Sequence, residues 1–379
     1  MLKIQTFFRV FLVIFFIQVS LLHPSLTLPF PQSLYGVLQP IVEAEKKNAG
    51  ARLSYAHFSS HVDQTYDSLT FVGDILLARN VEYLMQKQGT EYPFAGLNLS
   101  LIGNNSAVIG NFEAAIPQTH IRTPTEQITF SVATSAVPVL KKGGITHVSL
   151  ANNHAHDFEA EGLKHTKKVL EMNTISTFGE PDSVSSESVN YVHIKDQTVA
   201  LIALQGIGME TAPVSWRSLI RRATKQSDIQ IVFIHWGDEY ALRHSPAQEQ
   251  LATELVTTGV DLIIGHHPHV VEDIGVIEGV PVFYSIGNYI FDQYFSKDVQ
   301  EGLVLHVYED SGWYVHLLPV SSQGSLSQPH KMSDLAHQKF LRSLARKSQG
   351  EIRADIERGR IALLNLAVAT SSKMAMIRR

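Results

Sequence analysis

Residues 147–171, HVSLANNHAHDFEAEGLKHTKKVLE, combine an apolar run, a polar loop and a helical stretch. Similar apolar runs recur from Leu69 onward and alternate with helical stretches at Leu76–Gln88, Ser215–Lys225 and Pro246–Thr257. The runs are LTFVG, AVIG, HVSLA, VALIAL, IVFIH, DLIIG and VFYSIG. Short β-branched runs that alternate with helices predict an α/β fold, a layered α/β sandwich with a largely buried central sheet.

The carboxyl-terminal part of the chain has a different pattern. LVLHV and WYVHLLPV alternate in polarity and are separated by Glu309–Gly312, which predicts an antiparallel hairpin that closes an edge of the sheet. Residues Met332–Arg360 are charged and helical in pattern. We therefore expect the main domain to span residues 67–325 and a helical tail to span 326–379.

The amino terminus carries Lys3 and Arg9 before the apolar run Val10–Leu22. This length and flanking charge favour a signal peptide or uncleaved membrane anchor over residues 1–23, followed by a linker over 24–66. The alternative is a buried core helix. With an export signal, the protein would lie in the cell envelope, outside the cytoplasm, either anchored to the membrane or secreted.

The composition limits the chemistry that the chain can perform. The 379 residues are 44% hydrophobic and 18% charged, as in a folded globular protein. A net charge of −5 gives no electrostatic reason to expect a nucleic acid as partner. The absence of cysteine excludes disulfides, cysteine-type zinc sites and thiol nucleophiles, whereas 18 histidines remain as metal ligands.

Polar clusters directly follow six of the apolar runs. In α/β sheets, ligands bind beyond the carboxyl ends of the strands, so the clusters are expected to share one edge. They contain Asp, Glu, Asn and His but no Lys or Arg, which favours a cation over an anion. The clusters include Asp74; Asn111 and Glu113; Asn152–Asp157; His235; His266, His267 and His269; and Asn288 with Asp292.

Taken singly, these residues have simpler explanations. Asp74 could cap the following helix, Asn111 and Asn288 could satisfy turn backbone, and His235 could be a hydrogen-bonded structural histidine. The pair His267 and His269 is harder to explain in this way, because alternate side chains of an extended segment point to one side. Together the clusters predict a divalent metal site, with zinc or manganese as the metal.

The chemistry expected of such a site is hydrolytic. A metal would polarise a phosphoryl or carbonyl oxygen and promote the ionisation of water near neutral pH. Glu113 is the carboxylate best placed to reach two ions, and His154 is the candidate proton donor to a leaving group. Asp157, three residues after His154, could orient its imidazole. The sequence contains no G-x-S-x-G, Walker A or dinucleotide-binding motif.

Six stretches in this order resemble the CapA family of bacterial capsule-synthesis proteins, which is associated with poly-γ-glutamate and is also called PgsA. They are FVGDILLARN, GNFEAAI, SLANNHAHDF, FIHWGDEY, IIGHHPHVV and YSIGNYIFDQ. The resemblance implies a variant of the calcineurin-like metallophosphatase fold, with metals at the strand ends.

The resemblance also implies roles for individual residues. The predicted metal ligands are Asp74, Asn111, Glu113, Asn153, His235, His267 and His269, and the predicted catalytic residue is His154, with Asp157 added to it from its spacing. Two positions depart from the phosphatase pattern. Leu76 replaces an expected histidine, and the usual G-D-x-x-D reads Gly110-Asn111-Phe112-Glu113. One metal position is therefore expected to lack a ligand, leaving one metal, or two with the second weakly bound.

Three functions remain open from the sequence. The first is the biosynthesis, export or anchoring of an anionic capsule polymer, with the membrane and other capsule synthase subunits as partners. The second is metal-dependent hydrolysis of a phosphoester, or of amide bonds in poly-γ-glutamate or a cell-wall peptide. The third is a scaffold without catalysis, which Leu76 favours.

Overall fold

The computed structural model describes residues 64–99, 103 and 105–363. The predicted signal or anchor at 1–23 lies outside these residues, as do most of the predicted linker and the end of the predicted tail. Within the described ranges, no helix is long and apolar enough to cross a membrane. The described residues belong to one structural unit, Val62–Arg379.

Two sheets form the centre of this unit. The first has seven strands in the order β1 (Thr65–Tyr66), β6 (Val189–Ile194), β7 (Gln197–Gln205), β8 (Ile229–His235), β9 (Leu262–His266), β11 (Val280–Phe283) and β10 (Ile274–Ile277). The second has nine strands: β15 (His330–Lys331), β14 (Trp313–Ser321), β13 (Glu301–Glu309), β2 (Ser68–Ile75), β3 (Ser106–Phe112), β4 (His147–Ser149) and β5 (Ser176–Phe178) in order, with β12 (Asn288–Ile290) paired to β2 and β16 (Arg360–Ala362) to β14.

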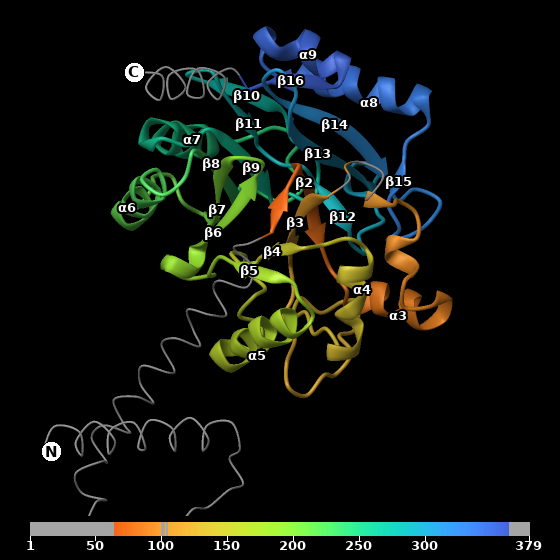
Figure 1. Cartoon of the computed structure of the whole chain (residues 1–379). Coiled ribbons are helices and arrows are strands. Elements are labelled where there is room, and N and C mark those ends of the chain that lie inside the picture. The colour runs from red at the N-terminus through yellow and green to blue at the C-terminus, as the bar shows by residue number, and fades with distance from the viewer. Residues whose placement is uncertain (1–63, 100–102, 104, 364–379) are drawn as a thin grey trace, which may run out of the picture. The chain divides into compact units, whose positions relative to one another are not determined.

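Helices cover the outer faces of both sheets (Figure 1). The α-helices are α3 (Arg79–Gln88), α4 (Pro138–Lys142), α5 (Glu159–Met172), α6 (Val214–Ala223), α7 (Pro246–Thr258), α8 (Asp334–Lys347) and α9 (Arg353–Arg358). Short 3-10 helices are η2 (Tyr92–Phe94), η4 (Thr134–Ala136), η5 (Ser186–Ser188), η6 (Asp298–Gln300) and η7 (Gly350–Ile352). One apolar core lies between the sheets, a second under α3, α4 and α5, and a third under α6 and α7.

The expected α/β layered sandwich is therefore confirmed, but the expected single central sheet is wrong. Central strands of both sheets, such as β2, β8 and β9, are buried on both faces and therefore apolar on both sides, so the sequence pattern cannot assign them to one sheet or the other. The helix expected from Leu76 begins at Arg79, because the Leu76 amide donates to the Ile290 carbonyl 2.8 Å away and continues the contact with β12.

The carboxyl-terminal elements are part of the sandwich. The predicted hairpin is confirmed as β13 and β14, which pair from Glu309 and Trp313. It lies beside β2 rather than at the edge of the sheet, because β14 is itself paired with β15 and β16. The helical stretch predicted after it divides into α8 and α9, and α8 inserts Leu341 and Leu344 into the core between the sheets. The domain boundaries expected from the sequence stay predictions.

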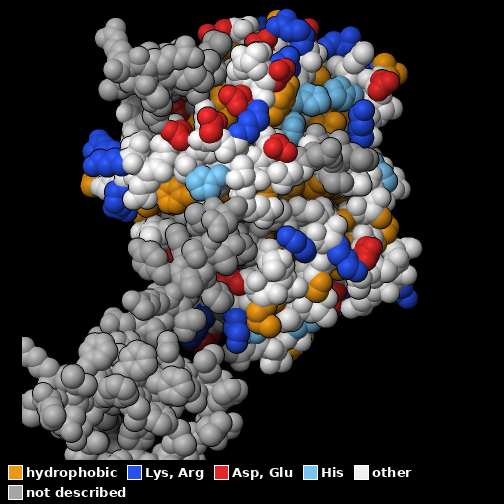
Figure 2. Space-filling view, viewed as in Figure 1, with side chains coloured by type: hydrophobic (Ala, Val, Ile, Leu, Met, Phe, Trp, Pro, Cys, Tyr) orange, Lys and Arg blue, Asp and Glu red, His pale blue; other side chains and the backbone are white. Residues whose placement is uncertain are grey.

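Charged side chains of both signs are interspersed on the face shown in Figure 2, including the region over α8 and α9. This distribution agrees with the sequence of α8, DLAHQKFLRSLARK, in which acidic and basic residues share one helix. The described residues on this face therefore form no extended patch of a single charge that would attract a strongly charged partner.

The backbone of β2 touches another segment of the chain at Gly73. A Cβ atom at this position would lie 1.7 Å from the carbonyl oxygen of Gly287. The next residue, Asp74, donates its amide proton to the same carbonyl at 3.2 Å. The absence of a side chain at Gly73 thus lets β12 pair with β2 and brings Asn288 opposite Asp74.

We expect Gly73→Ala to destabilise the protein by about 3 kcal/mol or more, because backbone rather than a flexible side chain blocks the new methyl group. Chemical denaturation measures the change in the free energy of unfolding. Gly350→Ala is the matched control, since a Cβ there has nothing within 4 Å. Equal stability of the two variants would contradict this account of β2.

Candidate metal centre

The strands of the two sheets carry polar side chains where the core between the sheets ends. On β3, β8 and β9, alternate side chains point into this core and are apolar until the last one. The last side chains of these rows are Asn111, His235 and His266, each fully buried. Because a strand alternates its faces, these three residues continue the direction of the apolar row before them and meet between the sheets.

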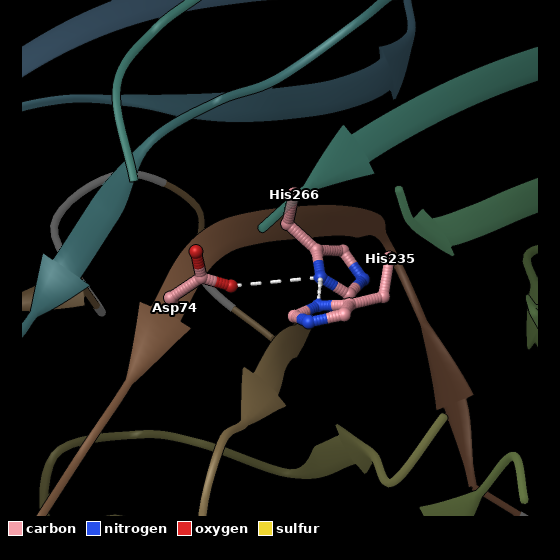
Figure 3. A group of neighbouring side chains, drawn as sticks. All are labelled: Asp74, His235 and His266. Atoms are coloured by element: carbon pink, nitrogen blue, oxygen red, sulfur yellow. Dashed lines mark hydrogen bonds and ion pairs between the residues drawn. The ribbon is translucent and has the colours of Figure 1, made fainter. Parts of the chain in front are cut away.

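Asp74, His235 and His266 form the first group of potential metal ligands, with ligand atoms within 4.8 Å of one another. Figure 3 shows His266 between the other two side chains. Its Nδ1 lies 2.8 Å from Nδ1 of His235 and 3.5 Å from Oδ1 of Asp74. Three different strands, β2, β8 and β9, therefore supply this group.

Burial sets the protonation of this group. It holds the pKa of His266 at about 3 and that of His235 well below its usual value, so both imidazoles are neutral at neutral pH. Burial alone would raise the pKa of Asp74, but hydrogen bonding to His269 and the proximity of His266 and His269 hold it at about 2. An ionised carboxylate beside neutral imidazoles is the protonation state that binds a divalent cation.

Glu113, His267 and His269 form a second group, again with ligand atoms within 4.8 Å. His269 connects the two groups, because its Nδ1 is 3.4 Å from Asp74 Oδ2 and its Nε2 is 3.7 Å from Glu113 Oε1. Burial and the nearby charge of Asp74 raise the pKa of Glu113 well above its usual range. The Glu113 carboxyl therefore binds a proton unless a cation takes the place of that proton.

Unpaired polar atoms test whether a cation fits here. Glu113 Oε1, His266 Nε2 and His267 Nδ1 are buried and have no hydrogen-bond partner among the described residues. Each unpaired buried atom costs about 1–3 kcal/mol. Carboxylate oxygens and imidazole nitrogens are ligands of zinc and related divalent metals, so the arrangement fits a divalent-metal site.

Asn111 lies between the two carboxylates. Its Nδ2 donates to Asp74 Oδ1 at 2.8 Å and to Glu113 Oε2 at 3.1 Å, while its Oδ1 accepts from Asn152 at 2.9 Å. The amide therefore turns its nitrogen, which cannot bind a cation, towards the carboxylates. Metal ligation by Asn111, which requires the oxygen, stays a prediction.

The predicted catalytic residues His154 and Asp157 lie beside the second group. His154 Nδ1 is 3.0 Å from Asp157 Oδ2, and its Nε2 is 4.0 Å from Glu113 Oε1. Asp157 also accepts the backbone amide of Phe130, whose ring stacks on His154 at 4.0 Å between centroids. The imidazole is thus fixed at one nitrogen and turned towards the centre with the other. The catalytic roles themselves stay predictions.

Asn153, the remaining predicted ligand, is exposed, and its Oδ1 lies 2.8 Å from Nε2 of His235. The structure therefore brings the two predicted ligand atoms together as a hydrogen-bonded pair. Its contact is with the first group, whereas His154 faces the second. Neighbouring residues of one loop thus contact different groups of the centre.

Comparisons with known proteins identify the family of this chain. The family model described as "Bacterial capsule synthesis protein PGA_cap" matches residues 68–293. The chain belongs to this family. The PGA biosynthesis protein CapA of Bacillus subtilis (strain 168) is 28% identical over 298 residues, which are 74% of this chain and 78% of that protein. The capsule biosynthesis protein CapA of Bacillus anthracis is 29% identical over 284 residues, 69% of each chain.

A solved structure of a putative 5′-nucleotidase from Staphylococcus aureus superposes with a TM-score of 0.42 at 12% identity. The superposition covers 70% of this chain and 54% of that one. A likeness at this level says nothing about activity.

Within this capsule synthesis protein, His266 is a potential ligand that the sequence did not predict, and the expected shortage of a ligand stays a prediction. Leu76, which replaces an expected histidine, is buried in the core under α3. The first group nevertheless contains two histidines, because His266 of β9 joins His235. The signal in the sequence was the alternation along DLIIGH, which aims His266 with the inward-facing residues of its strand.

Arg79 and Phe130 are also near the centre and were not predicted. Sequence alone placed no Lys or Arg at the strand ends, yet the Arg79 guanidinium lies 4.5 Å over the ring of Phe130 and pairs with Asp292. Arg79 follows Asp74 by five residues, and its left-handed φ of 53° turns the chain back into α3. Phe130 belongs to an irregular segment, and no periodic pattern in the sequence predicts where that segment lies.

We expect His266→Ala to weaken zinc or manganese binding by at least about tenfold, because changes even in partners of metal ligands alter affinity by roughly 10- to 100-fold. Isothermal titration of the chelator-treated protein measures the affinity. His193→Ala removes a histidine of β6 that lies outside both groups and is the control. Unchanged affinity in His266→Ala would exclude it as a ligand.

Metal binding should release protons from Glu113. Its raised pKa keeps the carboxyl protonated in the metal-free protein, and the ligand must be ionised, so affinity should increase as pH rises. Titrations in buffers of different ionisation enthalpy count the protons released. Glu113→Gln should abolish the release. Affinity that falls with rising pH would show that Glu113 is not a ligand.

Proposed function

We propose that this protein takes part in the biosynthesis of a poly-γ-glutamate capsule and that its metal centre acts on amide bonds of the polymer. Family membership supports the capsule assignment. The B. subtilis relative is named a PGA biosynthesis protein, and a relative in Mycobacterium tuberculosis (strain H37Rv) is named a probable polyglutamine synthesis accessory protein. The anionic polymer is thus the proposed partner and substrate.

The proposal depends above all on the two buried groups, Asp74, His235, His266 and Glu113, His267, His269, converging at one place. We propose zinc or manganese as the metal, with one or two ions bound. A divalent cation there would polarise the carbonyl oxygen of an amide and promote ionisation of water. The ligand that His266 adds argues against a scaffold without a metal.

His154 is proposed to give a proton to the leaving amine nitrogen. Its Nδ1 is bound to Asp157, which leaves Nε2, on the side of Glu113, as the nitrogen that faces the centre. The Asp157 carboxylate stabilises the protonated imidazole and fixes its tautomer. Because Phe130 holds Asp157 through its backbone amide and stacks on His154, the pair is oriented before a substrate arrives.

We also propose that the protein works at the outer face of the membrane, anchored or secreted, beside other capsule synthase subunits. The apolar amino-terminal run with its flanking Lys3 and Arg9 supports this location. At such a place the metal centre would meet the polymer as it leaves the cell. Cleavage there would set the length of the chains or release their ends.

His154→Ala should abolish cleavage of poly-γ-glutamate, measured as new amino ends, while the metal content stays unchanged. The control is His156→Ala, which removes a neighbouring histidine paired with Asp182 on the surface. In a strain with the variant gene, the polymer should change in length or amount. Cleavage by His154→Ala at the wild-type rate, or by wild-type protein stripped of metal, would refute the catalytic proposal.

A further inference from the structure

A cavity of about 140 Å³ lies between α8 and residues 297–301. Three lysines line it: Lys297 directly precedes η6, whereas Lys339 and Lys347 belong to α8. Asp298 and Glu301 are the acidic residues in its wall. The cavity has apolar walls behind these charges, formed by Val271, Phe340 and Leu344.

The charges in the cavity do not cancel. Lys297 is 3.1 Å from Glu301 and forms a pair with it. Lys347 donates to the Val271 carbonyl at 2.5 Å, and among the described residues neither Lys347 nor Lys339 has a carboxylate within salt-bridge distance. In the wall itself, Asp298 is the one remaining acid against these two ammonium groups, and Asp273 and Glu272 lie near Lys347 outside the wall. Burial lowers the pKa of Lys347 although these three acids act to raise it, so a further anion beside it would stabilise its charge.

Two stretches of chain connect the cavity to the metal centre. Val271 in the wall is two residues from His269, a separation of at most about 7 Å along the chain. The other stretch begins at Asn288, whose Oδ1 contacts His269 Nδ1 at 2.9 Å and whose Nδ2 donates to Gln293 at 3.2 Å. This stretch continues to Lys297 in the cavity wall. Asn288, which contacts His269 of the second group, and Lys297 thus belong to one continuous segment.

We propose that this cavity is an anion subsite that binds a free carboxylate of the polymer chain beside the metal centre. The identity of the polymer rests on the function proposed above. A γ-linked glutamate chain keeps one free carboxylate on every residue, so a chain with an amide at the metals presents carboxylates on either side. The net charge of −5 repels a polyanion overall, so a local lysine subsite would favour its binding at this place.

The test is binding of poly-γ-glutamate oligomers to the full-length protein in the presence of a chelator, so that the metals make no contribution. The double variant Lys339→Gln/Lys347→Gln should bind roughly tenfold more weakly, with a smaller dependence on salt. Lys164→Gln/Lys168→Gln removes the same charge from α5 and should bind as the wild type does. Equal weakening in both double variants, or equal binding of an amidated oligomer, would overturn the subsite.

Folding and catalysis are controlled separately. Because Lys347 is half-buried, thermal unfolding shows whether the double variant is still folded. Lys339→Gln alone changes an exposed side chain and should still weaken binding of the oligomers about threefold. Normal binding by a folded double variant, with cleavage still lost in His154→Ala, would refute the subsite alone. Weakened binding in a protein that cleaves nothing would support the subsite and refute the catalytic proposal.

Discussion

The structure depends on two carboxylates buried at one end of the core between the sheets. Asp74 and Glu113 are fully buried and both accept a hydrogen bond from the Asn111 amide, so a charge on one raises the free energy of ionising the other. The protein accommodates the pair by keeping Asp74 ionised and raising the pKa of Glu113. Four buried histidines, at 235, 266, 267 and 269, surround the pair; burial lowers the pKa of the first three, whose neutral rings offer lone pairs rather than counter-charge. A divalent cation is the partner that satisfies all of these groups together.

Much of this centre followed from the sequence because polar residues ended apolar runs. His235, His267, Glu113 and the spacing of His154 and Asp157 could be assigned in that way, and the structure brings them together. The division into two sheets could not be foreseen, since strands covered on both faces look alike in sequence. His266 was not a predicted ligand, because the alternate spacing of His267 and His269 does not include the last residue of the preceding strand. Arg79 and Phe130 depend on tertiary contacts of irregular backbone.

Backbone conformation at the centre carries a cost of its own. His267, His269 and Tyr240 have φ angles of 102°, 58° and 65°, values that side chains other than glycine rarely adopt. Each such residue costs on the order of 1–3 kcal/mol and persists where the surrounding structure dictates it. Here the Tyr240 amide is bound to the Pro268 carbonyl at 2.8 Å, and the His267 amide lies 3.3 Å from Asp74. The histidines are therefore oriented by strained backbone that other contacts hold in place.

The pairing of β2 with β13 has a consequence for the order of assembly. The strand that carries Asp74 is completed early in synthesis, but its neighbour on one side spans Glu301–Glu309, more than 200 residues later. Of the other residues in the two groups, Glu113 follows β3 of the second sheet, whereas His235 and His266 end strands of the first sheet and His267 and His269 come directly after it. A growing chain thus has an unpaired edge at β2 until β13 is made, although all residues of the two groups are present once His269 is made. Metal uptake would then depend on strands that follow the last histidine, because β12 and β13 hold β2, and with it Asp74, in place.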